Sequence, residues 1–311
     1  MNIHRLTNDP APELAAALAQ FEEQFTYPLG EGRAFRISHG DDYPRFFRAI
    51  GSASCFVAER AGAVLGVLGL AHTQVRVPNG GARSAIYFGD LKVAPAVRGG
   101  RVLMRLAEVA GGWCAGKAEC GFGVVMDGTR VTPDRYTGKL GVPPFREVAK
   151  IAVLRLPTAP APSAEWETSS ERGGATFAAL SLGRIGTCGG SPLERTEIEP
   201  VWLIAPDGSA CGRLEDTRRA KRLIATDGEM LAAHLSCIGY ANHPALVGLL
   251  RAACNSAARR GFPALFAAVP ADEARSVLGL LSEPEAVVAP ATVFASGFGT
   301  GQRWHINTAE I

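Results

Sequence analysis

The stretch from Tyr87 to Leu106, YFGDLKVAPAVRGGRVLMRL, decides how this chain folds. Its first part, up to Val93, has the aromatic and β-branched residues of a strand, and a turn with Pro95 and Gly99–Gly100 follows. Apolar residues then recur at helical spacing as far as Trp113. The pattern therefore predicts a strand, a turn and a helix in succession.

The beginning of this helix has the chemistry of an anion site. A helix N-terminus exposes unpaired N–H groups and the positive end of the helix dipole. Glycine has no Cβ, so Gly99 and Gly100 let a phosphate approach the backbone. Arg98 and Arg101 add charge and donors suited to phosphate oxygens. We therefore predict a pyrophosphate site, with a plain connecting turn as the alternative.

The pattern of the first half predicts the order β-α-α-β-β-β-α-β-α-β. Turn residues at 61–62 and 79–81 separate the middle strands. The expected strands are residues 2–6, 55–59, 64–75, 84–93, 121–126 and 148–156, and the expected helices are 11–25, 41–50, 99–113 and 133–140.

This half resembles the GNAT superfamily of CoA-dependent N-acyltransferases, in which many members read V-x-P-x-x-R-G-x-G-[IV] between the fourth strand and the third helix. Ala96 replaces the leading Gln or Arg, and Arg101 replaces the final small residue, where it either blocks the phosphates or grips them. The resemblance implies a site for acetyl-CoA or another acyl-CoA. The matching positions are Val93, Pro95, Arg98, Gly99 and Val102, and the implied binding residues are Leu91, Val93, Arg98, Gly99, Gly100, Arg101 and Val102.

The resemblance also suggests catalytic residues. Tyr136, shortly before Gly141, resembles the family tyrosine that protonates the leaving thiolate; the alternative is a half-buried helix tyrosine. Asp90 and Asp127 are the carboxylates nearest the expected cleft, and each is either the proton acceptor for the amine or a strand-edge or turn residue. A chain of water molecules is another candidate base. A main-chain N–H near Val93 is the implied oxyanion donor.

The second half repeats the order of elements without the glycine-arginine turn. A proline-rich segment at 157–163, PTAPAPS, predicts a linker. We therefore expect an α/β (α+β) fold of two tandem GNAT-like domains, residues 1–156 and 164–311, each with a mixed, mostly antiparallel twisted sheet flanked by helices. We call the predicted pyrophosphate site at residues 98–102 the cradle. The turn at 238–245, IGYANHPA, lacks it, so the second domain is expected to be degenerate and to shape the substrate pocket.

Elements of the second half are less sharply marked. The segment 230–238 fits either a strand or a half-buried helix, and 211–224 is expected to be one strand of a hairpin. The charged run 213–222, RLEDTRRAKR, predicts a solvated face, with an anionic-substrate patch as the alternative. The run 297–301, GFGTG, predicts a turn, since no helix follows it.

Composition limits the class of protein. The formal charge of +2 over 311 residues gives no attraction to nucleic acid or to an anionic membrane. Seven cysteines without close pairing favour a reducing cytoplasm, and the histidines show no metal-ligand spacing, so no metal is expected. The N-terminus lacks an apolar signal segment, and no apolar run is long enough to span a bilayer.

These observations predict a cytoplasmic N-acetyltransferase acting on a small amine. The altered cradle motivates an alternative, a non-catalytic acyl-CoA-binding or sensor protein. A third possibility is an aminoacyl-tRNA-dependent transferase, which the near-neutral charge disfavours. Pairing of an exposed closing strand between subunits is a route to a homodimer.

Overall fold

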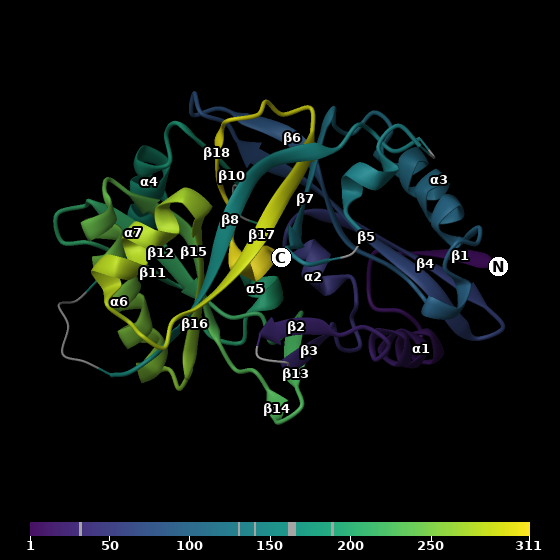
Figure 1. The fold of residues 1–311 in the computed structure, drawn as a ribbon, viewed down its shortest axis with the longest axis horizontal. Helices are drawn as coiled ribbons and strands as arrows, with labels where there is room; N and C mark the ends of the chain where they lie inside the picture. Colours follow the sequence, from purple (N-terminus) through teal and green to yellow (C-terminus); the bar gives the residue numbers. More distant parts are fainter. Residues whose placement is uncertain (31–32, 130, 140, 161–165, 188–189) are drawn as a thin grey trace.

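A large mixed sheet runs through the whole molecule in the computed structural model, which describes residues 1–30, 33–129, 131–139, 141–160, 166–187 and 190–311. Its strands follow the order β1-β4-β5-β6-β7-β17-β8-β16-β15-β12-β11-β9, with β10 and β18 joined at the side. Figure 1 shows this sheet extending from one end of the molecule to the other, with helices at both ends.

The first half contains most of the elements that its sequence predicts. In chain order they are β1 (Asn2–Leu6), α1 (Pro12–Glu22), β2 (Tyr27–Gly30), β3 (Arg33–Ser38), α2 (Arg45–Arg48), β4 (Ser52–Arg60), β5 (Ala63–Arg76), β6 (Ala82–Val93), η1 (Pro95–Val97), α3 (Val102–Cys114), β7 (Cys120–Met126), η2 (Pro133–Tyr136) and β8 (Arg146–Pro157).

The second half has a similar order. Its elements are β9 (Glu167–Thr168), α4 (Ser170–Leu180), β10 (Arg184–Thr187), α5 (Pro192–Arg195), β11 (Val201–Ile204), β12 (Ala210–Glu215), β13 (Arg222–Ala225), β14 (Gly228–Glu229), β15 (Ala233–Tyr240), α6 (His243–Arg259), β16 (Ala264–Pro270), α7 (Ala271–Leu281), β17 (Val287–Ser296), β18 (Arg303–His305) and η3 (Thr308–Glu310).

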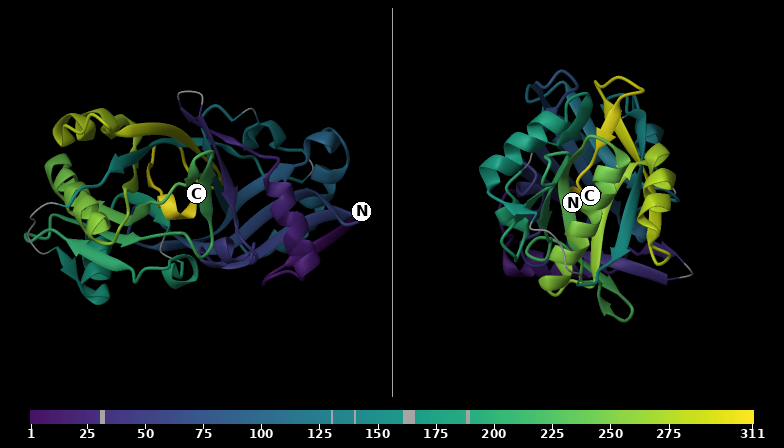
Figure 2. Two further views of the ribbon diagram at one scale, coloured as in Figure 1. Left: turned by 90° about the horizontal axis from the view of Figure 1, so that it is seen from below. Right: turned by 90° about the vertical axis from the view of Figure 1, so that its left-hand side faces the viewer.

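The two halves exchange their closing strands. In each half a parallel pair, β6 with β7 or β15 with β16, flanks a long helix. The closing strand β17 of the second half pairs with β7, and β8 of the first half pairs with β16. The two closing strands also pair with each other, so one continuous sheet joins the halves (Figure 2). The boundary at 157–163 stays a prediction, and residues 161–163 lie outside the described residues.

The first half has two hydrophobic cores, one on each face of the sheet, and alternate residues of β4 belong to one or the other. Cys55 and Val57 contribute to a core that includes α1 and α2, whereas Phe56 and Ala58 contribute to a core beneath α3. Successive strand side chains point to opposite faces, so α3 covers one face of the sheet and α1 with α2 covers the other. A further core packs α6 and α7 on the second half.

A small sheet connects the halves over the α1–α2 side. Its order is β14-β13-β3-β2, and β3 of the first half pairs with β13 of the second. The sequence did not predict β2 and β3. Proline and glycine interrupt β2, arginines interrupt the apolar residues of β3, and β13, the second partner of β3, lies far away in the chain.

Several expectations about individual elements are wrong. The helix expected at 41–50 is reduced to α2, and the one at 133–140 to the 3₁₀ turn η2. The single strand expected at 211–224 is divided into β12 and β13. The charged run 213–222 is largely buried and is not the solvated face expected. Residues 213–217, 220 and 221 are buried, Arg213 pairs with Glu215 and Arg218 with Asp216, and Arg219 and Arg222 alone in the run are exposed.

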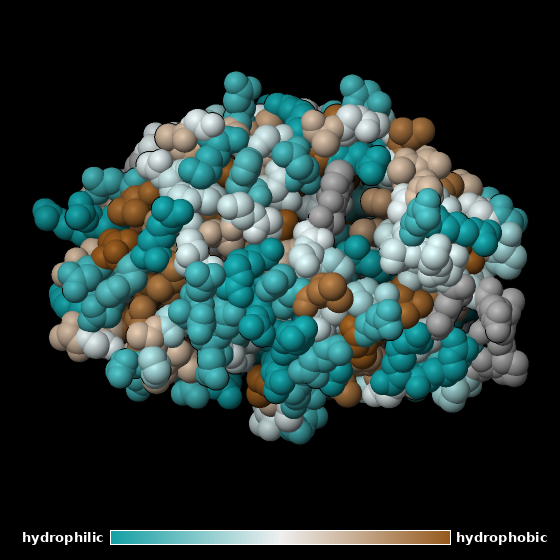
Figure 3. All heavy atoms as spheres, turned by 180° about the vertical axis from the view of Figure 1, so that it is seen from behind, coloured by the Kyte–Doolittle hydropathy of each residue, from teal (hydrophilic) through white to brown (hydrophobic). Residues whose placement is uncertain are grey.

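The surface is mostly polar on the side that Figure 3 shows, where apolar residues occur in small separate groups. Within the described residues, no helix combines the length and the apolar character needed to cross a lipid bilayer.

Candidate functional site

The candidate site lies where two parallel strands of the first half stop pairing. The register of β6 with β7 covers only Ala85–Tyr87 opposite Cys120–Phe122. The strands are still close just beyond this point, because a Cβ at Gly123 would lie 2.7 Å from the carbonyl oxygen of Phe88. Both strands then continue past the last pair. Ligands of α/β sheets bind at such carboxyl ends of strands.

A β-bulge lies in β6 beyond the last pair. Gly69 of β5 pairs with Gly89, and Val67 pairs with Lys92, so Leu68 alone faces Asp90 and Leu91. The backbone of Asp90 has φ +52°, which is uncommon for a residue with a side chain. A bulge redirects the main-chain groups of its strand, here next to the opening between β6 and β7.

The predicted cradle lies directly after β6 in the chain. After β6 the chain makes the short turn η1, and α3 begins at Val102. Gly99 has φ +81°, so a residue with a Cβ is disfavoured there. The N-cap residue of α3, Arg101, makes no capping hydrogen bond through its side chain to the described residues. The main-chain donors at the start of α3 thus suit an anionic ligand.

Two guanidinium groups flank this helix start. Arg98 and Arg101 are both exposed, and within the described part of the chain neither has an ion pair or a side-chain hydrogen bond. Arg105, one turn further along α3, is instead paired with Glu108 at 2.9 Å. The residues present therefore fit a pyrophosphate, with two charged donors for which no described residue competes.

The remaining predicted binding residues fix the cradle to the sheet. Val102 is buried and anchors α3 on β5, where a Cβ at Gly66 would lie 2.8 Å from its side chain. Val93 packs at the edge of the same core. Leu91 is 44% exposed next to the bulge, and Gly100 lies in the turn.

Asp90 is not a free carboxylate. Its Oδ1 lies 3.1 Å from Lys92 Nζ, and its Oδ2 accepts a hydrogen bond from the Tyr43 hydroxyl at 2.9 Å. His39 Nε2 lies 3.3 Å from the same oxygen. Burial alone would raise the pKa of Asp90, but Lys92 and His39 outweigh this effect and hold the pKa well below its usual range. The carboxylate stays ionised and is a weak base.

Asp127 lies elsewhere, directly after β7. Its Oδ1 accepts a hydrogen bond from Thr292 of β17 at 2.7 Å, and Lys150 of β8 lies 3.8 Å from its Oδ2. It lines an open groove of about 570 Å³ together with side chains such as Glu147 and Phe294. The exchanged strands β8 and β17 therefore form part of its surroundings.

Tyr136 is the last residue of η2 and is half-buried. The turn that carries it is held to the start of β8, because the Thr137 hydroxyl donates to the Phe145 carbonyl at 2.8 Å. Asp134 of the same turn lines the groove of Asp127. Tyr136 and Asp127 thus belong to one region, whereas Asp90 is directed toward α1 and α2. The catalytic roles of all three residues stay predictions.

A buried lysine of the second half lies close to the Asp90 cluster. Lys221 Nζ lies 4.7 Å from the ring of Phe46, which packs on His39, and it donates a hydrogen bond to the main-chain oxygen of Ile311. Burial, with Arg195 and Lys92 nearby, lowers the pKa of Lys221 to about 8. In the sequence, Lys221 is marked only by its place in the charged run 213–222.

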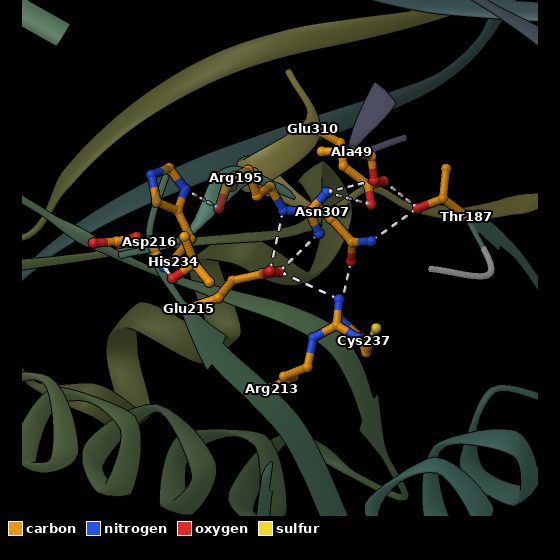
Figure 4. Close-up of polar contacts among 12 residues, drawn as sticks. Ala49, Thr187, Arg195, Arg213, Glu215, Asp216, His234, Cys237, Asn307 and Glu310 are labelled. Carbon is orange, nitrogen blue, oxygen red and sulfur yellow. Dashed lines mark hydrogen bonds and ion pairs between the residues drawn. The ribbon is translucent and has the colours of Figure 1, made fainter. Parts of the chain in front are cut away.

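The second half has an equivalent bulge in β15, but another segment of the chain occupies it. The register of β15 shifts at Cys237, which has φ +51°. The N–H of Cys237 donates to Asn307 Oδ1 at 2.8 Å, and the Asn307 amide donates to the Thr187 hydroxyl at 2.8 Å (Figure 4). A segment of the chain itself therefore occupies this bulge, and the helix that follows β15 begins without glycine or arginine.

A buried ion network supports this filling. Arg195 is fully buried and donates to both oxygens of Glu215, each at 3.0 Å, and to Glu310 at 3.3 Å (Figure 4). Glu310 in turn accepts from the Thr187 hydroxyl at 2.6 Å. The Arg195 guanidinium thus connects α5, β12 and the C-terminal η3.

Comparison with known proteins identifies the architecture. The chain matches no family model and no curated protein sequence. Its structure is similar to that of Saccharomyces cerevisiae N-myristoyltransferase with bound myristoyl-CoA, with a TM-score of 0.65 and 10% identity, over 97% of this chain and 84% of that chain.

A second likeness is to a GCN5-related N-acetyltransferase from Anabaena variabilis. The TM-score is 0.53 at 12% identity, over 94% of this chain and 72% of that chain. Both likenesses extend across the two halves, so the predicted α/β fold of tandem GNAT-like units is confirmed.

Proposed function

We propose that this chain, which has the tandem fold of GNAT-type N-acyltransferases, transfers an acyl group from CoA to a small amine. The main support for this proposal is the cradle at Arg98–Val102, which has a glycine at positive φ, uncapped helix donors and two exposed arginines. It lies directly after a bulged strand at the carboxyl end of a parallel pair. These features together suit a pyrophosphate whose attached arm reaches the strand opening.

The chemistry requires few groups. The amine nitrogen attacks the thioester carbon, a C–N bond forms, the C–S bond breaks and the thiolate leaves. A proton leaves the amine nitrogen and one is taken up by the thiolate. We assign thiolate protonation to Tyr136, and we keep Asp127 as the candidate acceptor of the amine proton. The low pKa of Asp90 makes it the weaker candidate.

We propose acetyl-CoA as the donor and leave the acyl length to experiment. The Saccharomyces cerevisiae neighbour binds myristoyl-CoA, so acyl-CoAs from acetyl to myristoyl belong in the same assay. The near-neutral net charge supports a small-molecule acceptor rather than a nucleic acid.

The test is release of free CoA thiol from each acyl-CoA in the presence of a panel of small amines. The proposal expects amine-dependent release that Arg98→Ala reduces by about tenfold or more, mainly through KM, because the arginine binds the donor. Arg275→Ala, an exposed arginine on α7, is the matched control. Absence of amine-dependent release with every acyl-CoA contradicts the proposal.

A non-catalytic acyl-CoA sensor is the second candidate. The observation in its favour is that the carboxylate closest to the bulge, Asp90, is occupied by Lys92 and Tyr43. A sensor binds acyl-CoA and raises the melting temperature of the protein, but it releases no thiol with any amine.

A further inference from the structure

A cluster of buried polar side chains surrounds the β6 bulge on the α1–α2 side. We call it the bulge clamp, and it consists of Glu22, His39, Tyr43, Asp90 and Lys92. Building on the proposed function, we propose that the bulge clamp holds Asp90 in its left-handed conformation and so aims the main-chain groups of the bulge at the acyl group. Asp90 is then a positioning residue.

The backbone at Asp90 needs such support. A side-chain-bearing residue at φ +52° persists only where its surroundings fix it. Lys92 follows two residues later, and its Nζ binds Asp90 Oδ1. The ion pair therefore ties both sides of the bulge to each other, and Lys92 also pairs in register with Val67 of β5.

The rest of the bulge clamp fixes Asp90 from outside the strand. Tyr43 binds Asp90 Oδ2 at 2.9 Å and is buried, with only 1% of its surface exposed. His39 approaches the same oxygen, and Glu22 holds His39 through Nδ1 at 2.5 Å and through its main-chain N–H at 3.1 Å. Elements before α2 thus determine the conformation of β6.

The bulge clamp is an ion-pair cluster and not a metal site. Ligand atoms of Glu22, His39 and Asp90 lie within 4.8 Å of one another, which is the spacing of a metal site. However, the ammonium group of Lys92 already lies 3.1 Å from Asp90 and supplies the positive charge there. We therefore assign no metal.

The second half gives independent support. The equivalent strand β15 has its bulge at Cys237 with nearly the same φ, +51°. There the bulge N–H is bound by Asn307 Oδ1, so the bulge directs a donor toward an oxygen outside the strand. The half with the cradle has the ionic clamp, and the half without the cradle has Asn307 in its bulge.

The first arm of the test measures the bulge clamp in the free protein. Hydrogen–deuterium exchange of a peptide covering residues 85–93 is compared in wild type, Asp90→Asn and Lys92→Met. We expect exchange of this peptide to be faster by about tenfold in both variants. Asp42→Asn is the matched control, because Asp42 is 16% exposed against 14% for Asp90 and is also paired, but with Arg45 and Arg48. Unchanged exchange in Asp90→Asn overturns the proposal.

The second arm measures transfer. Lys92→Met is expected to lower kcat by about tenfold while the KM for acetyl-CoA changes less than about twofold, because the cradle is untouched. Lys92→Arg keeps the ion pair and is expected to restore most of kcat, which distinguishes positioning from general damage to the fold.

The outcomes separate the two claims. If wild type transfers no acyl group, the proposed function fails, and exchange of residues 85–93 alone decides whether the clamp exists. If wild type is active and Lys92→Met keeps wild-type kcat, the positioning role is overturned and the proposed function stands.

Discussion

Gly99 is the residue whose backbone the cradle depends on most directly. Its φ of +81° is left-handed, yet a Cβ there would have no atom within 4 Å. Replacement by alanine therefore costs only backbone strain. We expect Gly99→Ala to lower the free energy of unfolding by about 1–2 kcal/mol, as measured by urea denaturation.

Gly111 is the matched control for this substitution. It lies inside α3 with open space around it, so Gly111→Ala is expected to raise stability by about 0.5–1 kcal/mol. If both alanines have the same sign of effect, the conformation assigned to Gly99 is wrong.

The sequence identified the cradle residues because Arg98, Gly99 and Gly100 are adjacent in the chain and their chemistry is local. The partners of Asp90 were not predictable in this way. Lys92 lies two residues after Asp90 in the same strand, so this pair could have been predicted from the sequence. Glu22 and His39 approach from elements that are distant in the chain. Lys221, from the other half of the chain, approaches Phe46, which packs on His39.

At the scale of elements, the C-terminal segment occupies the second bulge. Asn307 bonds to the N–H of Cys237 and to Thr187, and all three residues are buried. Removing its side chain leaves a buried donor unpaired. We expect Asn307→Ala to destabilise the protein by about 1–3 kcal/mol in urea denaturation.

Because Asn307 occupies the bulge of the second half, we expect one acyl-CoA to bind per chain. Isothermal titration with acetyl-CoA is expected to give a stoichiometry near one for wild type. Two equivalent sites would show that Asn307 does not occupy the second bulge in solution.

Strands and helices with strong periodicity were predictable, and β1 has the predicted bounds. Two kinds of element were not predictable. β3 lies between β2 and β13 of the second half, and pairing with a strand so distant in the chain is not visible in the local sequence. The charged side chains of β12 are buried because Arg195 and Arg213 both pair with Glu215, whereas charged residues of a strand are usually exposed.

At the scale of the whole molecule, the exchange of β8 and β17 makes the halves interdependent. A fragment of residues 1–156 leaves β8 without β17 and β16, its two neighbours. We expect this fragment to show no cooperative unfolding alone, and to recover it when co-expressed with residues 164–311. A fragment of residues 1–156 that unfolds cooperatively by itself would contradict this expectation.

Stability is also expected to fall in mild acid. His234 of β15 is buried, and burial, with Lys221 nearby, lowers its pKa to about 3. The unfolded chain takes up this proton below a pH of about 6.5, whereas the folded chain does so only near its lowered pKa. Stability from this group is therefore complete above that range, and it is lost as pH falls, by about 1.4 kcal/mol per pH unit.

His234→Gln tests this dependence by urea denaturation at several pH values between neutrality and acid. The variant is expected to show a shallower loss of stability with falling pH. His4→Gln, at a side chain that is 39% exposed, is the control. If the free energy of unfolding of His234→Gln depends on pH as it does in wild type, the pKa of His234 is not lowered in the folded state.

The central claim is that the turn before α3 binds the pyrophosphate of an acyl-CoA. The most direct measurement is the change in amide NMR shifts as acetyl-CoA is titrated into the ¹⁵N-labelled protein. The account predicts that Gly99, Gly100 and Val102 show the largest saturable shifts, and that Arg98→Ala weakens them. Saturable shifts confined to the turn before α6, or none at all, would contradict it.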